Sequence, residues 1–176
     1  IKLNPQNRCY LCKKAVFSRL FARAKELGFT NLADGTNKDD LGEYRPGLKA
    51  KEELGVLSPL INLRKFEIRK LSRELNLATA DKPSYACLLT RLPHEKEISI
   101  DELNLVEAAE NLLIKSGYAN VRARLDDKKM KLQMPFSSMQ SFLNDVKFKS
   151  IVKELVALGA AEVTLDLKGL REDVLA

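Results

Sequence analysis

The chain has 176 residues, of which 45% are apolar, and carries a formal net charge of +6. That length suffices for one sizeable hydrophobic core or two small ones. No signal peptide and no apolar run of about 18 residues is visible, so we expect a soluble globular chain without a membrane partner. The cysteine count of 3 is odd, which argues against a disulfide framework and favours a reducing, cytoplasmic compartment.

The positive charge is open to two interpretations. It fits a solvated surface with a modest lysine excess, and equally a partner that is a nucleotide, a phosphate or RNA. Only 6% of the residues are aromatic and none is Trp, so a stacking platform for single-stranded RNA is poorly supported. The chain begins with Ile1 inside a loop-like segment, residues 2–7, and we therefore expect a piece of a longer polypeptide.

The first half alternates helical segments with short apolar ones. Asn7 can cap a helix whose apolar residues recur at spacings of three and four, and Gly28 ends it. Short apolar segments bounded by turn residues are typical of buried strands, and their alternation with helices indicates an α/β fold around a parallel sheet. The expected elements are helices at 8–27, 47–54 and 64–75 and strands at 29–33 and 56–61.

The second half has a different order of elements. Ser99 begins a helix that Gly117 ends, and a later helical stretch breaks near Asp145. The order α-β-β-α-β predicts a small split-βαβ-like α+β module. We place the boundary near residues 92–97, which gives domains 1–93 and 94–176. The expected elements are helices at 99–116 and 137–158 and strands at 121–125, 130–134 and 162–167.

Residues 81–91 are too apolar at their centre for a solvated linker, and they carry a thiol, a hydroxyl and a guanidinium close together. Pro83 disfavours a helix that runs unbroken into Cys87. Cys87 is the candidate catalytic residue, acting alone as a nucleophile or sulfur donor or together with the other cysteines. Thr90 and Arg91 could grip a phosphate of a bound cofactor, although an ordinary surface arginine is the alternative.

The other two cysteines stand at the start of the first helix as Cys9-x-x-Cys12. There the unpaired N–H groups and the helix dipole stabilise thiolates, which can bind a metal. With Cys87 they make three thiol ligands, which suit a four-iron cluster with one open iron. A zinc site needs a fourth ligand, for which His94 is the single candidate. Two unremarkable thiols and a surface histidine are the remaining alternative.

The loop of residues 34–47 follows an expected parallel strand, where α/β folds place ligands. Gly35 and Thr36 allow backbone N–H groups to approach a phosphate of ATP. Asp39 and Asp40 could hold Mg²⁺, and Arg45 could clamp an anion. The alternative is a polar surface turn in which the aspartates stabilise the turn.

Three residues of the second half are candidates for the site: Glu110 as a second catalytic residue, and Arg122 and Arg124 as residues that bind an anionic substrate. Glu110 falls on a helix, and Arg122 and Arg124 share one face of a strand, because strand side chains alternate. Two arginines on one face can bind a carboxylate or phosphate, although a solvated sheet face is the alternative. The helix at 64–75 also presents basic residues, either to solvent or, less readily, to RNA. They are Lys65, Arg69, Lys70 and Arg73.

Several motifs occur in an order that resembles a known family. Together they are similar to the ATP-dependent sulfur transferases of the LarE type, within the PP-loop ATP pyrophosphatase superfamily. The resemblance covers most of the chain and is strongest from Asn4 to Arg91. The motifs are RCYLCK at 8–13, DGTNKDD at 34–40, YRPG at 44–47, DKP at 81–83, ACL at 86–88 and VEAAE at 106–110.

The resemblance implies a fold and a reaction. Residues 1–93 would be the C-terminal part of a PP-loop parallel-sheet domain, and residues 94–176 an α+β substrate-binding and oligomerisation module. Such enzymes use ATP and Mg²⁺ to adenylylate a carboxylate of a pyridinium dicarboxylate mononucleotide, and sulfur then replaces the adenylate to give a thiocarboxylate. The product leads to the nickel-pincer cofactor of lactate racemase.

The resemblance also implies residue roles. Cys87 falls on the sulfur-donor position, and Cys9 and Cys12 fall on the added pair of members that hold a [4Fe-4S] cluster. Three further positions match residues that handle the substrate or support the site: Glu110, Arg122 and Arg124. Members of this type assemble as hexamers, so self-association is implied too.

The chain departs from the family in places. The phosphate-binding SGGxDS loop is absent, so we expect no competent enzyme without that part. Thr90 stands where a serine is usual, which keeps the hydroxyl. Two alternatives stay open: a PP-loop tRNA thiolase, and a non-catalytic interaction module stabilised by zinc.

Overall fold

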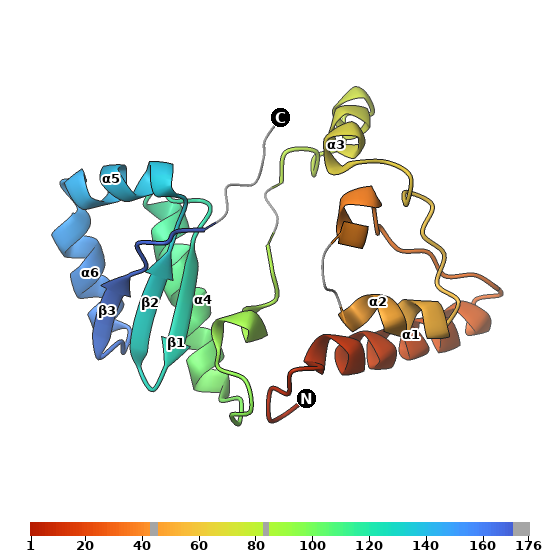
Figure 1. Ribbon diagram of the computed structural model, residues 1–176, viewed down its shortest axis with the longest axis horizontal. Helices are drawn as coiled ribbons and strands as arrows, with labels where there is room; N and C mark the ends of the chain where they lie inside the picture. Colours follow the sequence, from red (N-terminus) through yellow and green to blue (C-terminus); the bar gives the residue numbers. More distant parts are fainter. Residues whose placement is uncertain (43–45, 83–84, 171–176) are drawn as a thin grey trace. The chain divides into compact units, whose positions relative to one another are not determined.

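The computed structural model describes residues 1–42, 46–82 and 85–170, which form two compact units (Figure 1). The first unit contains Ile1 and residues 5–82, and the second contains residues 2–4 and the described residues from Tyr85 onward. The division falls earlier than the boundary expected after residue 93. The reason is that the turn after Cys87 packs against a helix and a strand of the second unit.

Helices dominate the first unit. Its three α-helices were predicted, whereas a short 3₁₀ helix forms within the loop expected at residues 34–47. The first α-helix follows Asn7 and ends just before Gly28, whose φ of +81° is a conformation that glycine adopts readily. It packs against the second helix. The elements are α1 (Arg8–Glu26), the short 3₁₀ helix η1 (Lys38–Gly42), α2 (Pro46–Glu53) and α3 (Lys65–Glu74).

The two strands predicted in this unit, at 29–33 and 56–61, do not form. A single parallel bridge joins Ala33 to Leu57, with hydrogen bonds from Asp34 N to Leu57 O and from Leu57 N to Leu32 O, both of 2.8 Å. Phe29 is 65% exposed and Leu57 51% exposed, so apolar side chains of both segments face solvent rather than a covering apolar layer of the described residues. Parallel strands need such layers on both faces, and the predicted parallel sheet is reduced to this bridge within the described residues.

The second unit follows the predicted order. Its long helical stretch breaks at Asp145, as expected, and Ser99 caps the first helix by accepting a hydrogen bond from Asp101 N. The elements are the 3₁₀ turn η2 (Leu88–Arg91), α4 (Ile100–Lys115), β1 (Arg122–Asp126), β2 (Lys129–Gln133), α5 (Phe136–Asn144), α6 (Phe148–Ala157) and β3 (Glu162–Leu165).

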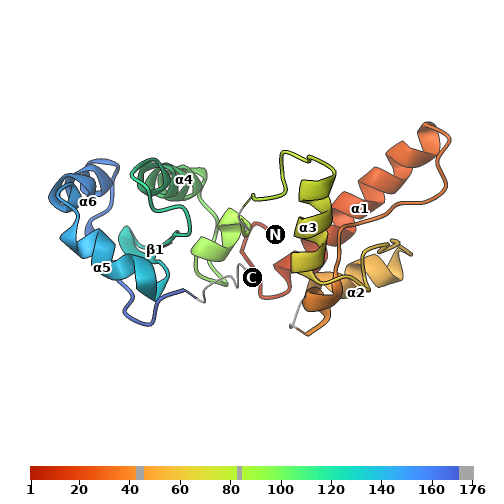
Figure 2. The same cartoon turned by 90° about the horizontal axis from the view of Figure 1, so that it is seen from above.

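The three strands of the second unit form one sheet in the order β1-β2-β3. β1 pairs with β2 antiparallel, and β2 pairs with β3 parallel across the α5–α6 crossover. α4 and α6 run side by side and pack on β1 and β3 respectively (Figure 2). Their contact with one face of the sheet buries the hydrophobic core and leaves the other face polar. Central core residues are Val106, Ala109, Leu113, Ala123, Leu125, Met130, Leu132, Phe142, Ile151 and Leu155.

None of the helices in the described ranges is long and apolar enough to cross a lipid bilayer.

Candidate functional site

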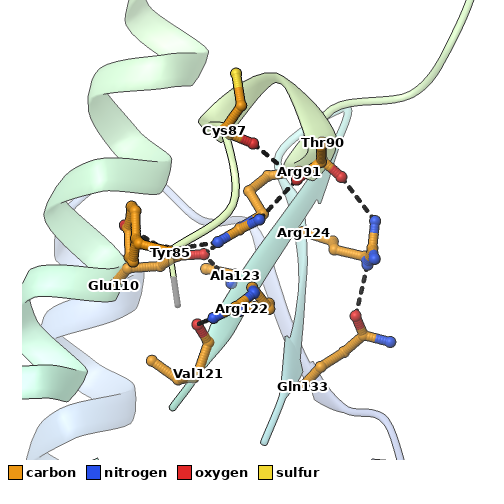
Figure 3. A network of polar contacts seen from close by, with 10 residues as sticks. All are labelled: Tyr85, Cys87, Thr90, Arg91, Glu110, Val121, Arg122, Ala123, Arg124 and Gln133. Atoms are coloured by element: carbon orange, nitrogen blue, oxygen red, sulfur yellow. Dashed lines mark hydrogen bonds and ion pairs between the residues drawn. The ribbon is translucent and has the colours of Figure 1, made fainter. Parts of the chain in front are cut away.

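Cys87 lies at the start of the turn η2, in an exposed position with a free thiol. Its backbone is extended, and its carbonyl oxygen accepts hydrogen bonds from Thr90 N at 2.9 Å and from Thr90 Oγ1 at 2.7 Å. Figure 3 shows the sulfur pointing away from the polar network beneath the turn. The turn therefore fixes the Cys87 backbone while the thiol stays open to a reaction partner.

Beneath the turn lies a buried ion pair between Arg91 and Glu110, whose side chains are 1% and 0% exposed. Arg91 donates from Nε to Glu110 Oε1 at 2.5 Å and from Nη2 to Oε2 at 3.2 Å. Ala123 N donates to Oε1 at 2.9 Å and the Tyr85 hydroxyl donates to Oε2 at 2.5 Å. Each carboxylate oxygen thus receives two donors, which is what a buried charge requires.

Glu110 therefore supports the site through Arg91. One carboxylate joins three parts of the unit: the segment around Cys87, the helix α4 that carries Glu110, and the strand β1 at Ala123 (Figure 3). Because both of its oxygens are engaged, we assign it to the framework of the turn. The same holds for Arg91, which is 2% exposed.

Tyr85 belongs to this network, and sequence reasoning missed it. Burial, followed by the hydrogen bond to Glu110, raises the pKa of Tyr85 to about 12. Its hydroxyl consequently keeps its proton at neutral pH and stays a donor. The Arg91 guanidinium also lies over the Tyr85 ring at 5.6 Å from its centre. The sequence feature that could have indicated a role for Tyr85 is its position two residues before Cys87.

Thr90 links the turn to two of the arginines that were predicted to take part in the site, Arg91 and Arg124. Its hydroxyl accepts a hydrogen bond from Arg91 Nη1 at 2.6 Å while donating to the Cys87 carbonyl. Its carbonyl oxygen accepts from Arg124 Nη1 at 2.7 Å. A serine would make the same three contacts, so the Thr90 departure from the family leaves this geometry intact.

Arg122 and Arg124 lie on one face of β1, as their spacing predicts. Ala123 and Leu125 point into the core between and beyond them, with 0% and 1% exposure. Arg122 Nη1 donates to the Val121 carbonyl at 3.0 Å. The sheet therefore presents two guanidinium groups on its open face, and the second of them contacts the Cys87 turn.

The loop of the first unit borders a cavity of about 310 Å³. Three of the predicted cofactor-binding residues line it, namely Gly35, Thr36 and Asp40. Asp39 instead accepts a hydrogen bond at Oδ2 from Lys65 N at 2.8 Å, which caps the start of α3. Arg45 lies outside the described residues. The other lining residues are Lys13, Phe17, Asp34 and Leu48.

A partly buried polar network holds one wall of this cavity. Asp34 accepts from Thr36 N at 3.1 Å, from Thr36 Oγ1 at 2.6 Å and from Ser58 Oγ at 2.7 Å. Ser58 Oγ in turn accepts from the buried Lys51 Nζ at 2.6 Å. Burial acts to raise the pKa of Asp34, but the hydrogen bonds from Thr36 and Ser58 and the Lys51 charge outweigh it and lower the pKa. Sequence reasoning missed Asp34, Lys51 and Ser58, because the contacts that join them are made only on folding.

Cys9 lies in the first turn of α1 and Cys12 about one turn further along it, whereas Cys87 belongs to the second unit. All three thiols are free; Cys9 is exposed and Cys12 is half-buried. Within the described ranges, no group of three or more His, Cys, Asp and Glu side chains is placed to hold a metal ion. His94 Nδ1 lies 3.2 Å from the Asn4 carbonyl oxygen.

The basic residues of α3 are partly engaged within their own unit. Arg69 Nη2 donates to the Lys82 carbonyl at 2.9 Å, and Arg73 pairs with Asp81 at 2.8 Å. Two cations of the predicted basic face therefore have structural partners, which weakens that face as an RNA-binding surface.

The chain matches no protein-family model. It is 40% identical over 168 residues to an uncharacterized protein of Synechocystis, covering 94% of this chain and 63% of that protein. It is 34% identical over 167 residues to an uncharacterized protein of Methanocaldococcus jannaschii, covering 94% of this chain and 64% of the relative.

A third relative carries a functional name. The chain is 34% identical over 175 residues to the pyridinium-3,5-bisthiocarboxylic acid mononucleotide synthase of Lactiplantibacillus plantarum, covering 97% of this chain and 62% of the synthase. This similarity agrees with the resemblance to the LarE type. The chain spans less than two thirds of the length of each of these relatives.

Proposed function

We propose that the chain is part of an ATP-dependent sulfur transferase that converts carboxylates of a pyridinium dicarboxylate mononucleotide into thiocarboxylates. The observation that carries the proposal is the exposed Cys87 thiol on a turn that the buried Arg91–Glu110 pair holds in place. Such a framework holds a reactive group in place by restricting the motion of the backbone that carries it. The similarity to a synthase of a bisthiocarboxylic acid mononucleotide supports the choice of substrate.

The open face of β1 is the proposed substrate site. Arg122 and Arg124 offer two guanidinium groups, which bind carboxylate or phosphate oxygens through paired N–H donors. Arg124 contacts the carbonyl oxygen of Thr90 within the Cys87 turn at 2.7 Å. An anion held there would bring its carboxylate to the thiol, which is the arrangement that acyl transfer to sulfur requires.

The loop cavity of the first unit is the proposed site for ATP and Mg²⁺. Gly35 and Thr36 would present backbone to the phosphates, with Asp40 available to the metal ion. ATP supplies an adenylyl group that turns a carboxylate oxygen into a leaving group. We also propose that the Ala33–Leu57 bridge is part of the parallel sheet of a PP-loop domain, which would comprise residues 1–93.

A [4Fe-4S] cluster is the proposed sulfur-bearing cofactor. The donor set fits it in kind, because the three free cysteines include a Cys-x-x-Cys pair near the start of α1. Cys9, Cys12 and Cys87 would hold it. When bound, such a cluster supplies an open iron that can carry a sulfide; without it, Cys87 alone would be the sulfur donor. The proposal includes a reducing, cytoplasmic setting and self-association.

Anaerobic reconstitution with iron and sulfide tests this proposal. We expect the wild-type chain to bind iron and Cys87→Ala to lose most of it. In a chain supplied with the SGGxDS phosphate-binding loop of the family, Cys87→Ala should also abolish thiocarboxylate formation. The control is Ser137→Ala, a change at an exposed position of α5. Full iron content and full product in Cys87→Ala would show that this role for Cys87 is wrong.

A further inference from the structure

Arg124 is held by a row of side chains that continues past β1. Its Nε donates to Gln133 Oε1 at 2.5 Å, opposite the end that donates to the Thr90 carbonyl (Figure 3). Gln133 Nε2 then donates to Asp166 Oδ2 at 2.7 Å. The row runs from the Cys87 turn across β1 and β2 to the residue that follows β3, and neither Gln133 nor Asp166 has a role in the function proposed above.

The orientation of the Gln133 amide is determined by its two neighbours. A guanidinium only donates hydrogen bonds and an ionised carboxylate only accepts them. The amide oxygen must therefore face Arg124, and the amide nitrogen must face Asp166. If the amide turned over, both contacts would be lost, so Asp166 selects the orientation in which Gln133 accepts from Arg124.

Asp166 is itself fixed in place. Its backbone N donates to the Leu132 carbonyl at 2.8 Å, and its Oδ1 accepts from Lys168 N at 3.1 Å. The side chain is 17% exposed. The hydrogen bond from Gln133, followed by that from Lys168 N, lowers the pKa of Asp166, so the carboxylate stays an acceptor at neutral pH.

The sheet register explains why Arg124 needs such an arrangement. Arg124 lies directly across from Lys131 in the β1–β2 pair, and Arg122 lies across from Gln133. Two cations opposite one another repel. The Arg124 guanidinium instead bonds to Gln133, its diagonal neighbour on β2, and Lys131 Nζ lies 3.8 Å from Asp166 Oδ2. The two cations are thus separated, and Arg124 is directed towards the turn.

We infer that Gln133, oriented by Asp166, is the positioning residue that directs the Arg124 guanidinium to the Cys87 turn for an anionic carboxylate or phosphate ligand. This inference rests on the proposed function for its ligand, but not for its geometry. Gln133 acts through Arg124 and does not itself bind the ligand. Without it, Arg124 keeps its charge and loses the hydrogen-bond acceptor that holds its Nε.

The test uses Gln133→Met, Asp166→Ala and the double variant. Gln133→Met keeps the length of the side chain and the net charge of the protein, and it removes the hydrogen bonds to Arg124 and Asp166. Gln140→Met is the matched control, because Gln140 is an exposed glutamine on α5. The first readout is the solvent-exchange rate of the Arg124 Nε–H group, which is measured by NMR. The Arg124→Lys variant identifies the signal of this group, because the signal disappears there. The second readout is the affinity for nicotinic acid mononucleotide, a carboxylate and phosphate probe. Thermal unfolding shows that each variant is folded.

Gln133→Met should speed exchange of the Arg124 Nε–H about tenfold, since one charge-assisted hydrogen bond is lost. It should weaken binding of the mononucleotide by about the same factor. As a single variant, Asp166→Ala should speed exchange of the Arg124 Nε–H. In the Gln133→Met background it should change that rate less than about twofold, because Asp166 acts through Gln133. Gln140→Met should match wild type in both readouts.

Two results would overturn the inference. Exchange of the Arg124 Nε–H that is unchanged in Gln133→Met would show that Gln133 does not position Arg124. Equal effects of Asp166→Ala in both backgrounds would remove Asp166 from the mechanism. Failure of the proposed function looks different: Arg124→Lys would then bind the mononucleotide as tightly as wild type, whatever the exchange rates show.

Discussion

The second unit supports its site on a continuous hydrophobic core beneath the sheet, whereas the first unit holds its loop cavity mainly through polar side-chain contacts. Among the residues described, the buried apolar side chains of the first unit are few and small: Ala50, Val56 and Ala80. The second unit buries residues as large as Phe142 and Met134. The difference shows that a thiol turn and a loop cavity in one chain can depend on different forces, and it can be tested one contact at a time.

The largest expected effect is in the second unit, at Glu110. Glu110→Ala leaves the Arg91 guanidinium buried without its counter-charge and removes the acceptor for Tyr85 and Ala123. We expect a loss of about 3–5 kcal/mol in the free energy of unfolding, measured by urea denaturation. Glu107→Ala, at an exposed position of the same helix, should change it by less than about 0.5 kcal/mol.

An equal, small loss in both variants would mean that the ion pair is open to water and does not support the turn. The free thiol offers a second readout. In Glu110→Ala, the labelling rate of Cys87 by a maleimide should change, because the turn that carries it loses its anchor to α4 and β1. Labelling of Cys9, which lies in the first unit, should stay as in wild type.

How far sequence reasoning succeeded differs between the units for a physical reason. Helices depend on local periodicity and caps, and every predicted helix formed, including the break at Asp145. The strands at 121–125, 130–134 and 162–167 were also found, because their alternating pattern finds partners within the same unit. The strands at 29–33 and 56–61 had no third partner among the described residues, and a strand exists only through its pairing.

The candidate site shows the same division. Residues that carry distinctive chemistry in a recognisable motif could be identified in advance, and the structure brings four of them together: Thr90, Arg91, Glu110 and Arg124. The residues that orient them could not be identified. Tyr85 and Gln133 have ordinary spacing, and their roles arise from which strand register and which buried carboxylate they meet. That the thiols of Cys9, Cys12 and Cys87 come close enough to bind one cluster stays a prediction.

In the first unit, Lys51→Met tests the polar wall of the loop cavity. The variant removes the donor to Ser58 and a charge 3.9 Å from Asp34. We expect a loss of about 1–3 kcal/mol in stability, the usual consequence of leaving buried acceptors unsatisfied. Lys49→Met, at an exposed position of the same helix, is the control, and both are read by urea denaturation. A Lys51→Met variant as stable as its control would show that apolar contacts hold the cavity wall.

A smaller loss is expected for Tyr85→Phe, which removes one hydrogen bond to Glu110 and leaves both contacts from Arg91. We expect about 1–2 kcal/mol at neutral pH, again from urea denaturation. The Phe ring keeps its position near Arg91, so packing is retained. An unchanged free energy of unfolding would mean that Glu110 Oε2 is satisfied by Arg91 alone.

The smallest effects lie in the pH dependence, where the two units should differ in direction. Asp34, in the first unit, has a pKa lowered below its ordinary value, so its contribution is present at neutral pH and is lost as pH falls through the folded pKa. Tyr85 and Tyr118, in the second unit, have their pKa values raised to about 12, chiefly by burial. Their neutral forms favour folding, so their contribution is complete below the ordinary value of 10.0 and is lost as pH rises towards 12.

Unfolding followed between pH 9 and about 12 should therefore show a steeper alkaline loss in wild type than in Tyr118→Phe, which has no phenol to ionise at that position. The mutant loses the hydrogen bond to Asp145 at every pH, so its curve begins lower and the two converge at high pH. Asp34→Asn should leave this alkaline limb unchanged and flatten the acid one. Parallel curves for wild type and Tyr118→Phe would show that the tyrosine ionises equally in the folded and unfolded chain, and that the contrast between the two units does not extend to their titration.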